Sequence, residues 1–189
     1  MGRGLALRAA LVLLLSVAAC GTPPAAAPNG TDVMFLQMGL VQIAEGDRVA
    51  QVTERRAADP EIRAVATELR AAWRTEVPMM RGWLQEWGKP READPGDGPH
   101  AGHGALHALR EEDFAGLSEF EGSEFDRAAV ALLLGNLHNA METIRMQAAD
   151  GSYPQAVDLA ERMTESRQHQ IQRLLALAAG EKPEGEQDD

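Results

Sequence analysis

Three histidines lie close together in the middle of the chain, at His100, His103 and His107. Their H-x₂-H-x₃-H spacing lets three imidazoles bind one Cu(II), Ni(II) or Zn(II) ion. The surrounding residues 88–104 are rich in Gly, Pro and Asp, which predicts a loop. Histidines on such loops are also often simply solvated. The spacing therefore leaves open both a site for copper or another divalent metal and an unoccupied loop.

A second group of polar residues falls on the apolar faces of predicted helices. On a helical wheel, Gln42 and Glu45 lie within the apolar stripe of one helix. Glu76 and Arg167 lie within the stripes of two others. Because an unpaired buried charge is costly, we expect Arg167 to pair with Glu45 or Glu76. Two alternatives stay open: the groups reach solvent at the edge of the fold, or His138 completes a metal or ligand site with Gln42, Glu45 and Glu76.

Familiar catalytic patterns are missing from the sequence. The Glu-x-x-His pairs of di-iron helical proteins, the P-loop, the HExxH zinc motif and the nucleophile elbow do not occur. We therefore predict that the protein is not an enzyme.

The elements that must position these residues are helices. Four long segments carry apolar residues at three- and four-residue spacing, and no alternating runs appear, which predicts an all-α fold. Pro60 and Pro154 suit the first turns of the second and fourth helices, and Gly151 closes the third. Ser123-x-x-Asp126 has the form of a capping box at the start of the third helix.

The two halves of the chain repeat when one is shifted by 94 positions. Two copies of a helical hairpin predict a four-helix bundle, because a single hairpin cannot bury its apolar face alone. The shift places Asp32 on Asp126, Pro60 on Pro154, Ala66 on Ala160, Leu69 on Met163 and Val77 on Ile171.

The first 20 residues have the form of an export signal. Arg3 and Arg8 precede a short apolar run from Leu11 to Leu15, which is too short to span a bilayer permanently. Small residues then lead to Cys20, the only cysteine, in a pattern that resembles the lipobox of bacterial lipoproteins. We expect lipid on Cys20 to anchor the exported chain to the cell membrane, on its extracellular or periplasmic side. An ordinary secretory signal is the alternative.

The charge of the chain excludes one class of partner. The formal net charge is −11, and loss of Arg3 and Arg8 with the signal makes it −13. Nucleic-acid binding needs basic surfaces, so we expect no nucleic-acid partner. Acidity equally disfavours polybasic docking on anionic lipid.

Three stretches resemble the domain of unknown function 305 family: DVMFLQM at 32–38, the run at 58–90, and SEFDRA at 123–128. The resemblance implies a ferritin-like helical bundle, often built from two hairpins. The family's hallmark is a His-His pair in the first helix of each hairpin and a Gln-x-x-Glu-Ile pattern in the second, linked in some members to copper or other metal binding. Here those positions hold Gln42-Ile43, Asn136-Leu137 followed by His138, Trp73-x-x-Glu76-Val77, and Arg167-x-x-Gln170-Ile171.

Only Glu76 remains as a ligand at those positions, so the resemblance implies the fold without its metal site. We expect a membrane-anchored, non-catalytic bundle without a cofactor, which binds a protein partner or has a structural role in the cell envelope. Handling of copper or another metal is the alternative. The expected organisation is a signal peptide at 1–19, a lipidated tether at 20–31, a first hairpin at 32–88, a His-containing loop and short helix at 89–122, a second hairpin at 123–179, and a disordered acidic tail at 180–189.

Overall fold

The computed structural model describes residues 26–92 and 109–180. Within these residues the chain forms five α-helices and no strand, which confirms the all-α prediction. In this part of the chain every helix is too short or too polar to cross a bilayer. The helices are α1 (Gly30–Arg56), α2 (Pro60–Glu86), α4 (Glu111–Glu119), α5 (Gly122–Asp150) and α6 (Pro154–Ala179).

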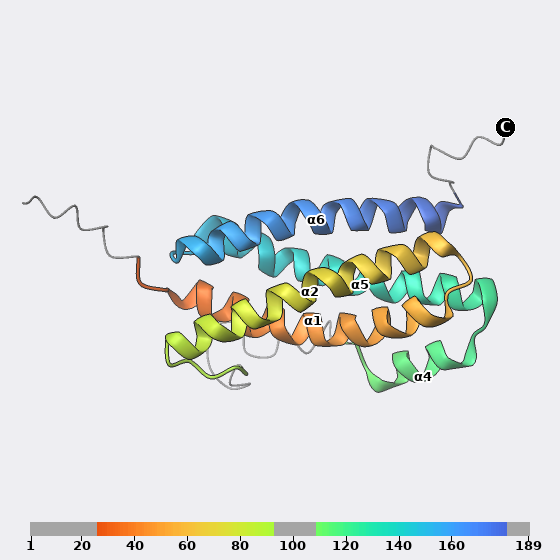
Figure 1. The fold of residues 1–189 in the computed structure, drawn as a ribbon, viewed down its shortest axis with the longest axis horizontal. Helices are drawn as coiled ribbons and strands as arrows, with labels where there is room; N and C mark the ends of the chain where they lie inside the picture. The colour runs from red at the N-terminus through yellow and green to blue at the C-terminus, as the bar shows by residue number, and fades with distance from the viewer. Residues whose placement is uncertain (1–25, 93–108, 181–189) are drawn as a thin grey trace, which may run out of the picture.

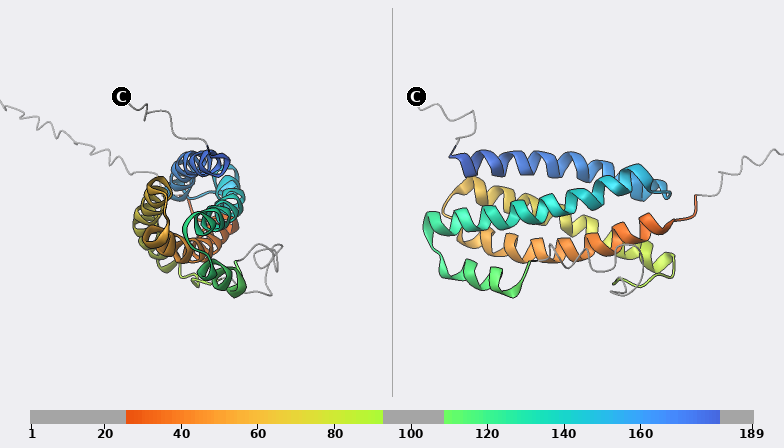
Figure 2. Two further views of the ribbon diagram at one scale, coloured as in Figure 1. Left: turned by 90° about the vertical axis from the view of Figure 1, so that its right-hand side faces the viewer. Right: turned by 180° about the vertical axis from the view of Figure 1, so that it is seen from behind.

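The four long helices lie side by side around one apolar core (Figure 1). Helix α1 packs against α2 and α5, and α5 packs against α6, while α2 and α6 meet over a smaller area. Seen from one end, the long helices surround the core and α4 lies outside them, against α5 (Figure 2). Side chains that face inward from any long helix therefore meet in one central region.

Local sequence signals explain where the helices begin. Helix α1 starts at Gly30, two residues before the expected position, because Asn29 and Asp32 form a capping box. The Asn29 side chain accepts from the Asp32 N–H at 3.0 Å, and the Asp32 carboxylate accepts from the Asn29 N–H at 2.7 Å. Helices α2 and α6 start at Pro60 and Pro154, where a missing N–H leaves no helical bond unmade.

Equivalent aspartates of the two halves bind equivalent turns. Asp126 accepts from the N–H groups of Ala58 and Asp59, at 2.8 and 2.9 Å. Asp32 accepts from the N–H groups of residues 152 and 153, at 3.1 to 3.2 Å. These two residues stand 94 positions after Ala58 and Asp59 in the sequence. Each aspartate thus joins its own half to the other, and the repeat seen in the sequence is present in the contacts.

This use of Asp126 means that the predicted capping box at Ser123-x-x-Asp126 is wrong. Helix α5 begins at Gly122, and its N-cap residue, Glu121, makes no side-chain cap. The Asp126 carboxylate instead accepts hydrogen bonds from the partly buried turn between α1 and α2.

Candidate functional site

A buried ion pair joins α6 to α2 in the middle of the fold. Arg167 Nη2 lies 2.5 Å from Glu76 Oε2, and the two side chains are 1% and 9% exposed. Arg167 also donates to Gln170 Oε1 at 3.2 Å, and its guanidinium carbon lies 5.8 Å from the Trp73 ring centroid. Of the two partners expected for Arg167, the structure brings it to Glu76. Neither side chain of this pair lies at the solvent-exposed edge of the fold.

Burial dominates the electrostatics of this pair. It raises the pKa of Glu76 above its ordinary value, while the Arg167 charge and hydrogen bond, and the charge of Arg162, act in the opposite direction. Burial likewise lowers the pKa of Arg167, and Glu76 counters this. Each group therefore depends on the other for its charge, and removal of either would leave a charge without compensation.

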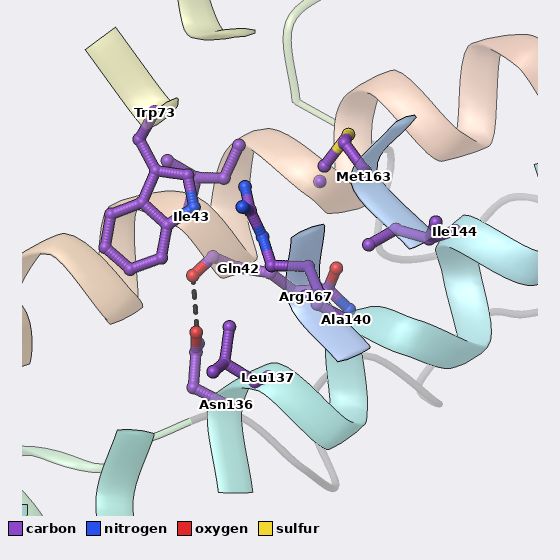
Figure 3. A pocket seen from close by; sticks show the side chains of 10 residues that line it. Gln42, Ile43, Trp73, Asn136, Leu137, Ala140, Ile144, Met163 and Arg167 are labelled. Atoms are coloured by element: carbon purple, nitrogen blue, oxygen red, sulfur yellow. Dashed lines mark hydrogen bonds between the residues drawn. The ribbon is translucent and has the colours of Figure 1, made fainter. Parts of the chain in front are cut away.

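Next to the ion pair, buried side-chain amides join α1 to α5. Asn136 Nδ2 donates to the backbone carbonyl oxygen of Gln42 at 2.9 Å, and Gln42 Nε2 donates to Thr143 Oγ1 at 3.3 Å. The side chains of Gln42, Asn136 and Arg167 are among those that surround a small space (Figure 3). Its volume is about 10 Å³, close to the minimum that holds one water molecule. The polar centre is thus closely filled by the protein itself.

Positions that are equivalent in the two halves meet at this centre. Gln42 corresponds to Asn136 under the 94-residue shift, and Trp73 corresponds to Arg167. Each pair is in contact, through the hydrogen bond and the cation–π contact described above. The 94-residue repeat therefore brings equivalent residues of the two halves into contact at this centre.

Glu45 and His138 lie outside this cluster. Glu45 is half-buried; burial raises its pKa, while a backbone hydrogen bond from Leu109 and the charge of Arg48 lower it. His138 is exposed, and its Nδ1 lies 2.8 Å from the carbonyl oxygen of Leu134 on its own helix. The residues proposed as a four-membered ligand set thus do not converge.

Metal ligands of the usual kinds do not gather in the described residues either: 26–92 and 109–180 hold no group of three His, Cys, Asp or Glu side chains suited to one ion. The second set of candidates, His100, His103 and His107, lies outside the described residues, as does Cys20.

Gly46 on α1 is a residue of the site that sequence reasoning missed. A Cβ added there would lie 2.8 Å from Trp73 Cη2 and 3.1 Å from Asn136 Cγ. The missing side chain is what lets the Trp73 ring reach the polar centre. A glycine inside a predicted helix was the available signal, because it weakens the helix relative to alanine and so suggests a packing reason.

Gly46→Ala is expected to destabilise the protein by up to about 2 kcal/mol, because the cost of about 1–3 kcal/mol for moving the indole or the amide outweighs a gain in helix propensity of about 0.5–1 kcal/mol. Gly82→Ala on α2 is the control, since nothing lies within 4 Å of its added Cβ. The control is expected to be stabilising by about 0.5–1 kcal/mol. Urea unfolding of both variants measures the difference. Equal effects of the two substitutions would contradict the close approach at Gly46.

Comparison with known proteins places the chain in a family. Three solved structures share its fold. A DUF305 protein of Streptomyces coelicolor described as secreted has a TM-score of 0.71 and 21% identity, over 84% of this chain and 98% of that one. A DUF305 fragment of Deinococcus radiodurans has a TM-score of 0.68 and 20% identity, over 84% of this chain and 99% of that one, and CopM in its Cu(II)-bound form has a TM-score of 0.67 and 20% identity, over 79% of this chain and 96% of that one. A comparison with curated proteins finds no match. The model of the family described as Domain of unknown function (DUF305) matches residues 32–178, and the chain therefore belongs to the DUF305 family.

Proposed function

We propose that this chain is an exported lipoprotein, anchored through lipid on Cys20, that has a non-catalytic binding or structural role in the cell envelope. Its working part is a ferritin-like four-helix bundle made of two repeated hairpins. The export and anchor proposals rest on the sequence pattern that ends at Cys20. The proposed role rests on the ion pair between Arg167 and Glu76 at the centre of the bundle.

The argument from the ion pair concerns what the centre can still bind. Its guanidinium and carboxylate are bound to each other, and the neighbouring amides of Gln42 and Asn136 already have protein partners. A metal ion or small molecule would have to separate a buried ion pair and enlarge a space of about 10 Å³. The polar centre is therefore suited to fixing the packing of the helices. A partner would bind to the surface of the bundle.

The second candidate function is the handling of copper or another divalent metal. CopM in its Cu(II)-bound form shares the fold. In this chain the ligands would be His100, His103 and His107, whose types and spacing suit Cu(II), rather than the residues of the bundle centre.

A Cu(II) titration of the full chain, purified without a histidine tag, separates these proposals. We expect no binding tighter than that of a variant with His100, His103 and His107 all changed to Ala. Tight binding that this triple variant loses would favour metal handling by the loop. Tight binding that the triple variant keeps, and that Gln42→Leu abolishes, would contradict a centre filled by its own side chains. Calorimetry together with elemental analysis gives the stoichiometry.

A further inference from the structure

An aromatic cluster occupies one end of the bundle. Trp83 and Trp87 lie on and just after the last turns of α2, and Tyr153 lies in the turn between α5 and α6. The Tyr153 ring meets both indoles edge-on, with centroids 5.8 Å from Trp83 and 5.0 Å from Trp87. Both tryptophans are half-buried, so each packs on the core with one part and reaches the surface with another.

The first helix of the bundle begins at this same end, and Cys20 precedes that helix in the sequence. Helix α1 begins where α2 and α5 end (Figure 1). Asn29 is fixed there, because its side chain donates to the carbonyl oxygen of Asp150 at 2.8 Å in addition to capping α1. Nine peptide units separate Cys20 from Asn29, which span at most about 32 Å when extended.

We propose that this end of the bundle, through the half-buried Trp83 and Trp87, rests on the phospholipid headgroups of the membrane that holds the lipid anchor, while the buried Tyr153 supports the two indoles from behind. The inference rests on the proposed anchoring at Cys20. Tryptophan favours the headgroup layer, where its apolar ring and its polar N–H are both accommodated. Exposed Lys89 and Arg91 follow Trp87, and their long side chains can reach the phosphates.

The length of the bundle gives this orientation a consequence. Helix α5 has 29 residues and is about 43 Å long, so a bundle standing on this end holds its other end well away from the bilayer. The turn between α1 and α2 lies at that distant end, together with the start of α5 (Figure 2). Those segments then face away from the bilayer, where they are accessible to a protein partner.

Quenching of tryptophan fluorescence by spin-labelled lipid tests the contact. The lipidated full chain is reconstituted into phosphatidylcholine vesicles that carry a nitroxide on the headgroup. Trp73→Phe keeps Trp83 and Trp87 as reporters, and the matched control, Trp83→Phe with Trp87→Phe, keeps only the buried Trp73. We expect nitroxide lipid to reduce the reporter emission about two-fold and to leave the control emission nearly unchanged.

Flotation of the same vesicles shows whether the protein is anchored to them, independently of whether its tryptophans contact the headgroups. Protein that floats with the vesicles while Trp83 and Trp87 emit as they do with unlabelled lipid would overturn the proposed orientation and leave the anchor intact. Equal quenching of reporter and control would also overturn it. Protein that stays in the aqueous fraction would overturn the anchor, and the orientation with it. Circular dichroism of each variant verifies that the helices are intact.

Discussion

Replacing Arg167 with Met is expected to destabilise the protein by about 3–5 kcal/mol at pH 7, because Glu76 remains buried without its counter-charge. Urea unfolding gives the free energy of unfolding. The control is Arg173→Met on the same helix, since Arg173 also pairs with α2, through Glu61 and Glu68, but in a partly exposed position. That change should cost about 1 kcal/mol or less. Equal losses in the two variants would contradict the importance of burial.

The loss in Arg167→Met should also depend on pH, and its sign follows from the pKa of Glu76. Burial already raises this pKa above 4.5, and removal of Arg167 takes away the largest opposing influence. The folded variant then binds a proton more tightly than the unfolded chain does. The contribution of Glu76 to the stability of the variant is therefore highest at low pH and falls as the pH rises through the folded-state pKa. We expect the destabilisation relative to wild type to shrink as the pH is lowered toward 5.

Asp32→Asn is expected to cost about 3 kcal/mol or more, because several charge-assisted hydrogen bonds end on this one carboxylate. Asp32 is fully buried and accepts from Gln147 Nε2 at 2.6 Å, from the Asn29 N–H, and from the N–H groups of Ser152 and Tyr153. An asparagine keeps only one accepting oxygen and turns its own N–H groups toward these donors.

The equivalent change in the other half, Asp126→Asn, is the natural comparison for Asp32→Asn. Asp126 is slightly more exposed and accepts from two backbone N–H groups, so we expect about 1–2 kcal/mol. Thermal or urea unfolding of both variants gives the ranking. A larger loss for Asp126→Asn than for Asp32→Asn would contradict this account of how the two halves are joined.

The sequence predicts the helices well because their signals are local. Apolar spacing, together with Pro60 and Pro154, is sufficient to place the long helices, and each acts within a few residues. The internal repeat adds long-range information, since equivalent residues such as Gln42 and Asn136 are expected near a shared axis. Arg167 could be assigned to the core because a charged residue in the middle of an apolar stripe must find a partner.

The remaining details depend on which element lies next to a helix face, and a helical wheel does not contain that information. Glu45 falls on the stripe by angle, yet a backbone hydrogen bond from Leu109 and the charge of Arg48 give it a separate environment. His138 falls at the border of its stripe and is exposed. Asp126 resembles a cap in sequence, but the turn between α1 and α2 reaches it in space. For Glu45 and Asp126 the difference comes from a contact between residues far apart in the chain.

The account depends most on the claim that the polar groups at the centre serve each other. A double-mutant cycle of Arg167→Met and Glu76→Gln, measured by urea unfolding at pH 7, tests this directly. We predict a coupling energy of at least about 2 kcal/mol, with the double variant well above the stability expected from adding the two single losses. A coupling energy below about 0.5 kcal/mol, the scatter of independent sites, would contradict the claim.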